Sequence, residues 1–91
     1  MTAFSVEDFK REREAPGAIV LDTRKPTDFT HGFIPGAVSI GLEGRFAEWA
    51  SNLLRVDKPI LLVSESGQEQ DAADRLLRIG FSNVRGYLEG G

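Results

Sequence analysis

The sequence predicts an α/β fold for residues 1–91, in which a small, mostly parallel central sheet carries helices on both faces. The runs Ala18–Leu21 and Ile60–Val63 are apolar at every position and bounded by turn residues, which is typical of strands covered on both sides. Segments with helical spacing of apolar residues alternate with the predicted strands, and such alternation favours parallel strands joined by right-handed crossovers. We therefore expect a single three-layer domain.

The first helix is predicted close to the N-terminus. Ser5, with Asp8 three residues later, resembles a capping box at a helix start. Val6 and Phe9 supply an apolar side for this short helix, and Gly17 ends the segment. The strand Ala18–Leu21 follows directly.

Prolines mark the next part of the chain. Pro26 is placed to begin a short helix that reaches Phe29. Pro35 and Gly36 indicate a turn, after which Ala37–Ile40 is expected to form a second short strand.

Two helices are predicted in the second half of the chain, on either side of the strand Ile60–Val63. Arg45–Leu54 carries one apolar stripe, from which we expect Phe46 and Trp49 to fill the core. Gln68–Ile79 is the second helix, and Gly80 is expected to adopt the left-handed conformation that often follows a helix. The expected buried set of this second helix is Ala72, Ala73, Leu76, Leu77 and Ile79. A final strand is predicted over Asn83–Tyr87.

The loop after Ile60–Val63 is the main candidate site. Backbone N–H groups gather where such a loop enters a helix, and they form a natural cradle for an anion. Asp22 follows the first apolar strand, so it shares the carboxyl edge of the sheet with this loop, where ligands bind in parallel sheets. The loop contains neither a cysteine nor a basic residue; it consists of Ser64, Glu65, Ser66, Gly67, Gln68 and Glu69.

Composition excludes several classes of function. The chain has no cysteine, which rules out disulfides, thiolate catalysis and thiolate metal sites, and its single histidine, His31, rules out a histidine cluster. The net charge of −3 gives no support for binding nucleic acid or an anionic membrane. No signal-peptide pattern or membrane-length apolar run is present, so we expect a cytoplasmic protein without metal or cofactor.

The motifs together resemble the rhodanese-like family across nearly the whole chain. The first match is LDTR over residues 21–24, followed by Phe29 and by GFIPGAVSI over residues 32–40. The second match is the strand, loop and helix up to Gly80, with LEGG at residues 88–91. The resemblance is nearest to the non-catalytic rhodanese-like module found in fusions with metallo-β-lactamase-fold hydrolases, as FAEWASNLL, ILLVSESG and GYLEGG indicate.

This resemblance implies a rhodanese fold without rhodanese catalysis. The family's persulfide-carrying cysteine falls on Ser64, and an arginine common later in the loop falls on Glu69. The family's usual histidine after the first glycine of GFIPGA is Phe33 here. The final helix of the family is absent, so we expect 1–91 to be a fragment of a larger protein.

Most polar candidates have a structural interpretation beside the functional one. A serine nucleophile needs a base, so Ser64 is better explained as a loop or N-cap serine. Glu65 and Glu69 favour the helix dipole, and they also repel an anion from the cradle. For Asp22 and Arg24, bracing of the sheet edge is favoured over binding of a ligand.

Two residues of the segment after Arg24 carry weaker hypotheses. His31 is interpreted as a surface or hydrogen-bonded side chain rather than a catalytic base. Phe33 is a candidate contact for a partner protein.

We expect a catalytically inactive module that contacts another protein segment. The resemblance implies that this partner is a metallo-β-lactamase-fold hydrolase domain or a second rhodanese-like domain. One alternative is a small anion-binding or sulfurtransferase-related enzyme that uses the loop from Ser64 to Glu69 together with Asp22 and Arg24. A stand-alone regulatory or sensor protein is a further alternative.

Overall fold

The computed structural model of the protein describes residues 1–25 and 36–90. Within these residues the chain forms one five-stranded sheet in which every pairing is parallel and the strand order is β1-β5-β4-β2-β3. The strands are β1 (Thr2–Phe4), β2 (Ile19–Asp22), β3 (Val38–Ser39), β4 (Ile60–Val63) and β5 (Val84–Leu88). The predicted α/β fold is confirmed.

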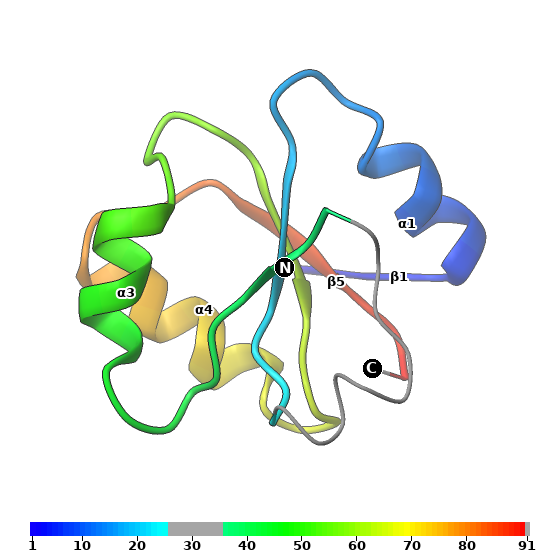
Figure 1. The fold of residues 1–91 in the computed structure, drawn as a ribbon. Coiled ribbons are helices and arrows are strands. Elements are labelled where there is room, and N and C mark those ends of the chain that lie inside the picture. Colours follow the sequence, from blue (N-terminus) through cyan, green and yellow to red (C-terminus); the bar gives the residue numbers. More distant parts are fainter. Residues whose placement is uncertain (26–35, 91) are drawn as a thin grey trace.

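Helices cover both faces of the sheet (Figure 1). α1 (Val6–Glu12) packs on one face against β1 and β5, whereas α3 (Phe46–Leu53) and α4 (Glu69–Arg78) lie together on the other. The central strand β4 supplies both layers, because Ile60 and Leu62 belong to the core under α3 and α4 while Leu61 and Val63 belong to the core around α1. This double burial explains why β4 is apolar at every position.

The first helix begins as predicted. The Ser5 hydroxyl caps it by accepting a hydrogen bond from the Asp8 backbone N–H at 3.2 Å. Phe9 is buried in the smaller core, but Val6 is exposed, so the expectation that both form the apolar side was wrong for Val6. A helix of seven residues offers little contact area, and Phe9 fills it.

The strand β1 was not predicted. It pairs with β5 so that Thr2 lies opposite Gly86, where the backbones of the two strands approach closely. A Cβ atom on Gly86 would collide with the Thr2 carbonyl oxygen and with the Phe4 ring. Glycine at this position therefore allows the N-terminal strand to join the sheet.

The apolar stripe of α3 lies differently from the prediction. Phe46, Ala50 and Leu54 form the buried line at intervals of four residues. Trp49 and Leu53 lie one position earlier on the helix surface and are 54% and 53% exposed. The prediction that Trp49 fills the core was wrong, because the sheet contacts only one narrow side of this helix.

The end of α4 confirms the predicted role of Gly80. This glycine has φ +98, and its N–H donates to the Leu77 carbonyl at 3.1 Å. The Phe81 N–H donates to the Leu76 carbonyl at 2.9 Å, and both side chains are buried in the larger core. This pattern is a Schellman motif with its apolar contact. Leu77 itself is exposed, contrary to the prediction.

The remaining boundaries differ modestly from the predicted ones. The second predicted strand is reduced to Val38–Ser39 at the sheet edge, and the last strand begins one residue later than expected. The helix predicted from Pro26 to Phe29 lies outside the described residues, as does Pro35. Among residues 1–25 and 36–90, no helix is long and apolar enough to cross a membrane.

Candidate functional site

The candidate site lies at the carboxyl edge of β2 and β4. These neighbouring strands run in register, with Asp22 opposite Val63, and the Thr23 N–H donates to the Val63 carbonyl at 2.8 Å. The residues that follow the two strands are thereby brought together. The structure confirms that Asp22 and Ser64 share one edge of the sheet.

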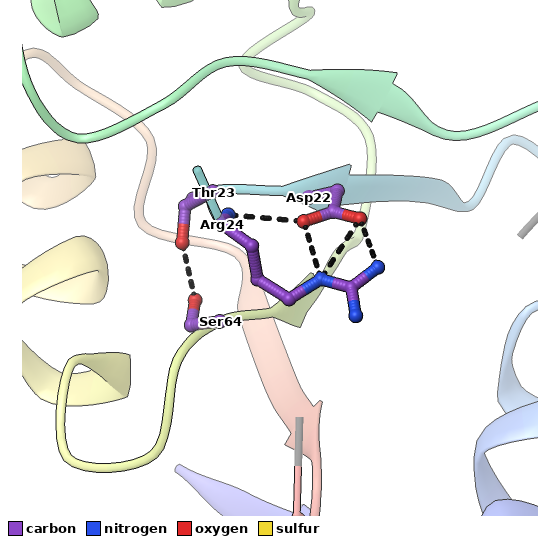
Figure 2. A network of polar contacts seen from close by, with 4 residues as sticks. All are labelled: Asp22, Thr23, Arg24 and Ser64. Carbon is purple, nitrogen blue, oxygen red and sulfur yellow. Dashed lines mark hydrogen bonds and ion pairs between the residues drawn. The ribbon is translucent and has the colours of Figure 1, made fainter. Parts of the chain in front are cut away.

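The Ser64 side chain is fully buried. Its Oγ lies 2.6 Å from Oγ1 of Thr23, which is also buried (Figure 2). Either hydroxyl can donate in this bond. Among the described residues, Thr23 is the hydrogen-bond partner of the Ser64 side chain.

Ser64 therefore has a structural role. Ser64 was expected to be a loop or N-cap serine, and it is a loop serine, because the N-cap residue of α4 is Gln68. Its hydroxyl joins the loop to the end of β2. Thr23 was not singled out from the sequence, although its place between Asp22 and Arg24 marks it as the residue that points to the opposite side.

Asp22, which is buried, and Arg24, which is partly buried, form an ion pair beside this contact (Figure 2). The Arg24 Nε donates to both carboxylate oxygens at 3.0 and 3.2 Å, and its NH2 group donates to Oδ2 at 2.7 Å. The Arg24 backbone N–H also donates to Oδ1 at 3.0 Å. The Asp22 carboxylate is thus fully engaged in fixing the chain where it leaves β2.

The loop after β4 carries a second unexpected contact. The Gly67 N–H, in a residue with φ +91, donates to Oε1 of Glu69 at 2.8 Å. The Gln68 N–H donates to the Glu65 carbonyl at 2.9 Å. Two backbone donors of the predicted anion cradle are therefore occupied by the protein's own oxygens. Glu69 therefore does more than repel an anion by its charge. Its carboxylate accepts the hydrogen bond that the Gly67 N–H would otherwise donate to an anion.

A cavity of about 380 Å³ opens beside this loop. Its walls include Thr23, Lys25, Leu42, Glu43, Glu65 and Gln68. Arg75 of α4 holds Leu42 in place, since its NH1 donates to the Leu42 carbonyl at 2.6 Å, and the Arg75 NH2 lies 3.1 Å from Oδ2 of Asp71. Lys25, Leu42 and Glu43 were not identified as site residues from the sequence, because they come from segments whose approach to the loop depends on the tertiary fold.

Glu65 is the least satisfied polar side chain of the site. Its Oε1 atom is buried and accepts no hydrogen bond. In the described part of the chain, neither Lys25 nor any other cation lies within ion-pair distance of this carboxylate. His31 and Phe33 lie outside the described residues, and within those residues no group of three or more His, Cys, Asp or Glu side chains is arranged to hold a metal ion.

Comparisons with known proteins agree with this architecture. The sequence model of the rhodanese-like domain family matches residues 5–91 of this chain. The crystal structure of the Alr3790 protein from Anabaena sp. superposes with a TM-score of 0.80 and 26% sequence identity over 97% of this chain and 71% of that one. The solution structure of the rhodanese-like domain of the same protein gives a TM-score of 0.80 and 26% identity over 100% of this chain and 70% of that one.

A more distant likeness concerns the fold alone. The human single-domain sulfurtransferase TSTD1 gives a TM-score of 0.69 at 17% identity, covering 100% of this chain and 91% of that one. No curated protein sequence matches the chain significantly.

Proposed function

The chain belongs to the family of rhodanese-like domains, and because it contains no cysteine we infer that it transfers no sulfur and serves as a protein-interaction module. The observation that carries this proposal is the state of position 64. The family pattern places the persulfide-bearing cysteine at this position, but the residue here is Ser64. The Ser64 hydroxyl is buried and hydrogen-bonded to Thr23. Within residues 1–25 and 36–90 this hydroxyl is bonded to Thr23 and to no basic group. A hydroxyl without a base is a poor nucleophile, and a buried one does not meet a substrate.

The loop geometry supports the loss of anion chemistry as well. The Gly67 N–H is bonded to the Glu69 carboxylate, and Glu65 presents a second carboxylate to the adjoining cavity. An incoming anion would have to displace the first of these carboxylates and approach the other. At a separation of about 4 Å, like charges repel by roughly 1–4 kcal/mol, depending on exposure.

The surface of α3 supports a role in contacts. Trp49 and Leu53 are each about half exposed on one side of that helix. Large apolar side chains that neighbour one another on a surface are typical of protein–protein contacts, in which tryptophan is enriched. We propose that the partner is a metallo-β-lactamase-fold hydrolase domain or a second rhodanese-like domain, a choice that rests on the sequence resemblance.

Trp49 provides the experiment, because it is the only tryptophan of the chain. Acrylamide should quench its fluorescence readily in the isolated chain, since the indole is half exposed. Addition of a purified metallo-β-lactamase-fold partner domain should shift the emission to shorter wavelength and reduce quenching. Leu53→Ser should weaken this protection, whereas Val6→Ser, an equally exposed apolar position on α1, should leave it unchanged. Unaltered quenching with both candidate partner domains would refute the contact role proposed for α3.

The alternative is a small anion-binding or sulfurtransferase-related enzyme that uses the Ser64–Glu69 loop. It predicts that thiosulfate or sulfate shifts the backbone amide signals of residues 64–68. The occupied Gly67 N–H favours the opposite outcome, which is no saturable shift at millimolar anion. A saturable shift confined to this loop would establish the alternative.

A further inference from the structure

We propose that the cavity beside the loop from Ser64 to Glu69 binds a guanidinium group. The predicted anion cradle at this loop would then lie beside a binding site for a cation. The proposal deepens the interaction role, on which it rests, by naming the chemistry of the partner. Its evidence is the set of charged groups that line one cavity without being paired to one another.

Glu65 is one of the charged residues that line the cavity. Its Oε1 atom is buried and accepts no hydrogen bond, while the side chain lines the 380 Å³ cavity. An ionised carboxylate accepts hydrogen bonds and donates none, so only a donor can satisfy it. A buried acceptor left without a donor is costly, and a charged donor relieves that cost most effectively.

Other polar groups in and beside the cavity favour a cation over an anion. The two hydroxyls of Thr23 and Ser64 are bonded to each other, and the Gly67 N–H is bonded to Glu69. Among the side chains that line the cavity, the amide of Gln68 and the ammonium of Lys25 are the donors that remain for an anion. Glu43 adds a second carboxylate to the wall, and within residues 1–25 and 36–90 it has no ion-pair partner.

The lining of the cavity suits a guanidinium better than a simple ammonium. A guanidinium presents five N–H donors in one plane, so it can donate to more than one acceptor, and both Glu65 and Glu43 line this cavity. Its flat apolar faces also suit a cavity that includes the side chain of Leu42. Lys25 opposes such a ligand by charge, and this opposition makes the proposal testable with variants of opposite expected sign.

The probes are agmatine and N-acetyl-arginine-N-methylamide, titrated into the ¹⁵N-labelled chain at constant ionic strength. We expect saturable amide shifts confined to residues 23–25, 41–43 and 65–68. N-acetyl-glutamine-N-methylamide is the neutral control and should produce none. Tighter binding of the arginine derivative would identify a protein partner's arginine as the source, whereas equal or tighter binding of agmatine would identify a free small cation.

Three variants test the charges directly. Glu65→Gln keeps the shape of the side chain and should weaken binding of both guanidinium probes about tenfold or more. Lys25→Gln should strengthen it by roughly threefold. Glu48→Gln removes an exposed carboxylate of α3 that does not line the cavity, and it should change nothing.

The proposal is overturned if the wild-type chain gives no saturable shift with either guanidinium probe. Equal affinity of the wild type and a folded Glu65→Gln variant would also overturn it. Neither result depends on Trp49, so failure of this inference is distinguishable from failure of the proposed contact through α3.

Discussion

The side-chain oxygens of Thr23 and Ser64 lie 2.6 Å apart in the core, joining the end of β2 to the loop that follows β4. In the family pattern the second of these positions carries the reactive cysteine. Here its hydroxyl is used to tie two strands together at the carboxyl edge of the sheet. The surrounding fold is retained, and the position has a structural role.

The Thr23–Ser64 bond predicts a particular pattern of stability. Thr23→Val or Ser64→Ala alone leaves one buried hydroxyl without a partner, which should lower the free energy of unfolding by about 1–3 kcal/mol. The double variant removes both hydroxyls and should cost clearly less than the sum of the two single changes. Urea unfolding of the four proteins measures this coupling. Strictly additive losses would show that the two hydroxyls do not depend on each other.

The Asp22–Arg24 pair predicts a much larger effect than a surface ion pair. Asp22→Asn removes a buried carboxylate that accepts from the Arg24 side chain and backbone, and we expect a loss of about 3–5 kcal/mol in unfolding free energy. Asp8→Asn breaks the exposed pair with Arg11 on α1 and should cost about 1 kcal/mol or less. Similar losses for the two variants would contradict the bracing role of Asp22.

The contact from Gly67 to Glu69 predicts that two changes are needed to restore sulfur loading. Ser64→Cys alone places a thiol in a buried position while Glu69 still occupies the loop donor, so thiosulfate should leave it unmodified. Ser64→Cys combined with Glu69→Arg frees the Gly67 N–H and adds a cation, so partial persulfide loading is expected. Intact mass after thiosulfate treatment measures the added sulfur.

Ser66→Cys is the control for these variants, because it places a thiol in the exposed part of the same loop. It should not acquire the thiosulfate-derived sulfur. Absence of loading in a folded double variant would mean that Glu69 is not the group that blocks the loop.

The close approach at Gly86 predicts that β1 depends on this glycine. A methyl group there would collide with the Thr2 carbonyl and the Phe4 ring, so Gly86→Ala should destabilise the domain by about 1–3 kcal/mol. Gly41→Ala is the matched control, because the nearest atom to its new Cβ, the Arg24 carbonyl oxygen, is 4.0 Å away. Hydrogen exchange should show loss of protection confined to β1 and its pairing with β5. Equal stability of the two variants would contradict the predicted collision.

The sequence predicted the strands that the hydrophobic effect dictates. β2 and β4 are covered on both faces, so β4 is apolar at every position and β2 is apolar up to Leu21. Parallel pairing then brings Asp22 and Ser64 to one edge of the sheet. β1 escaped prediction because its three residues, TAF, form no recognisable run and its pairing depends on a distant glycine.

The details of the site depend on tertiary geometry. Trp49 follows the same helical spacing as the buried residues of α3, and only the rotation of that helix against the sheet leaves it exposed. The acidic character of the loop could be predicted from the sequence. The hydrogen bond from the Gly67 N–H to the Glu69 carboxylate could not, because it depends on local backbone geometry. The cavity wall formed by Leu42 and Glu43 is set by Arg75, a contact between residues far apart in the chain.

The central claim is that this rhodanese-like domain transfers no sulfur. The most direct measurement is the formation of thiocyanate from thiosulfate and cyanide by the purified wild-type chain, with an active rhodanese as the positive control. We predict a rate equal to that of buffer alone. Turnover above buffer by the wild-type chain, lost on Ser64→Ala and unaffected by Ser66→Ala, would contradict the account.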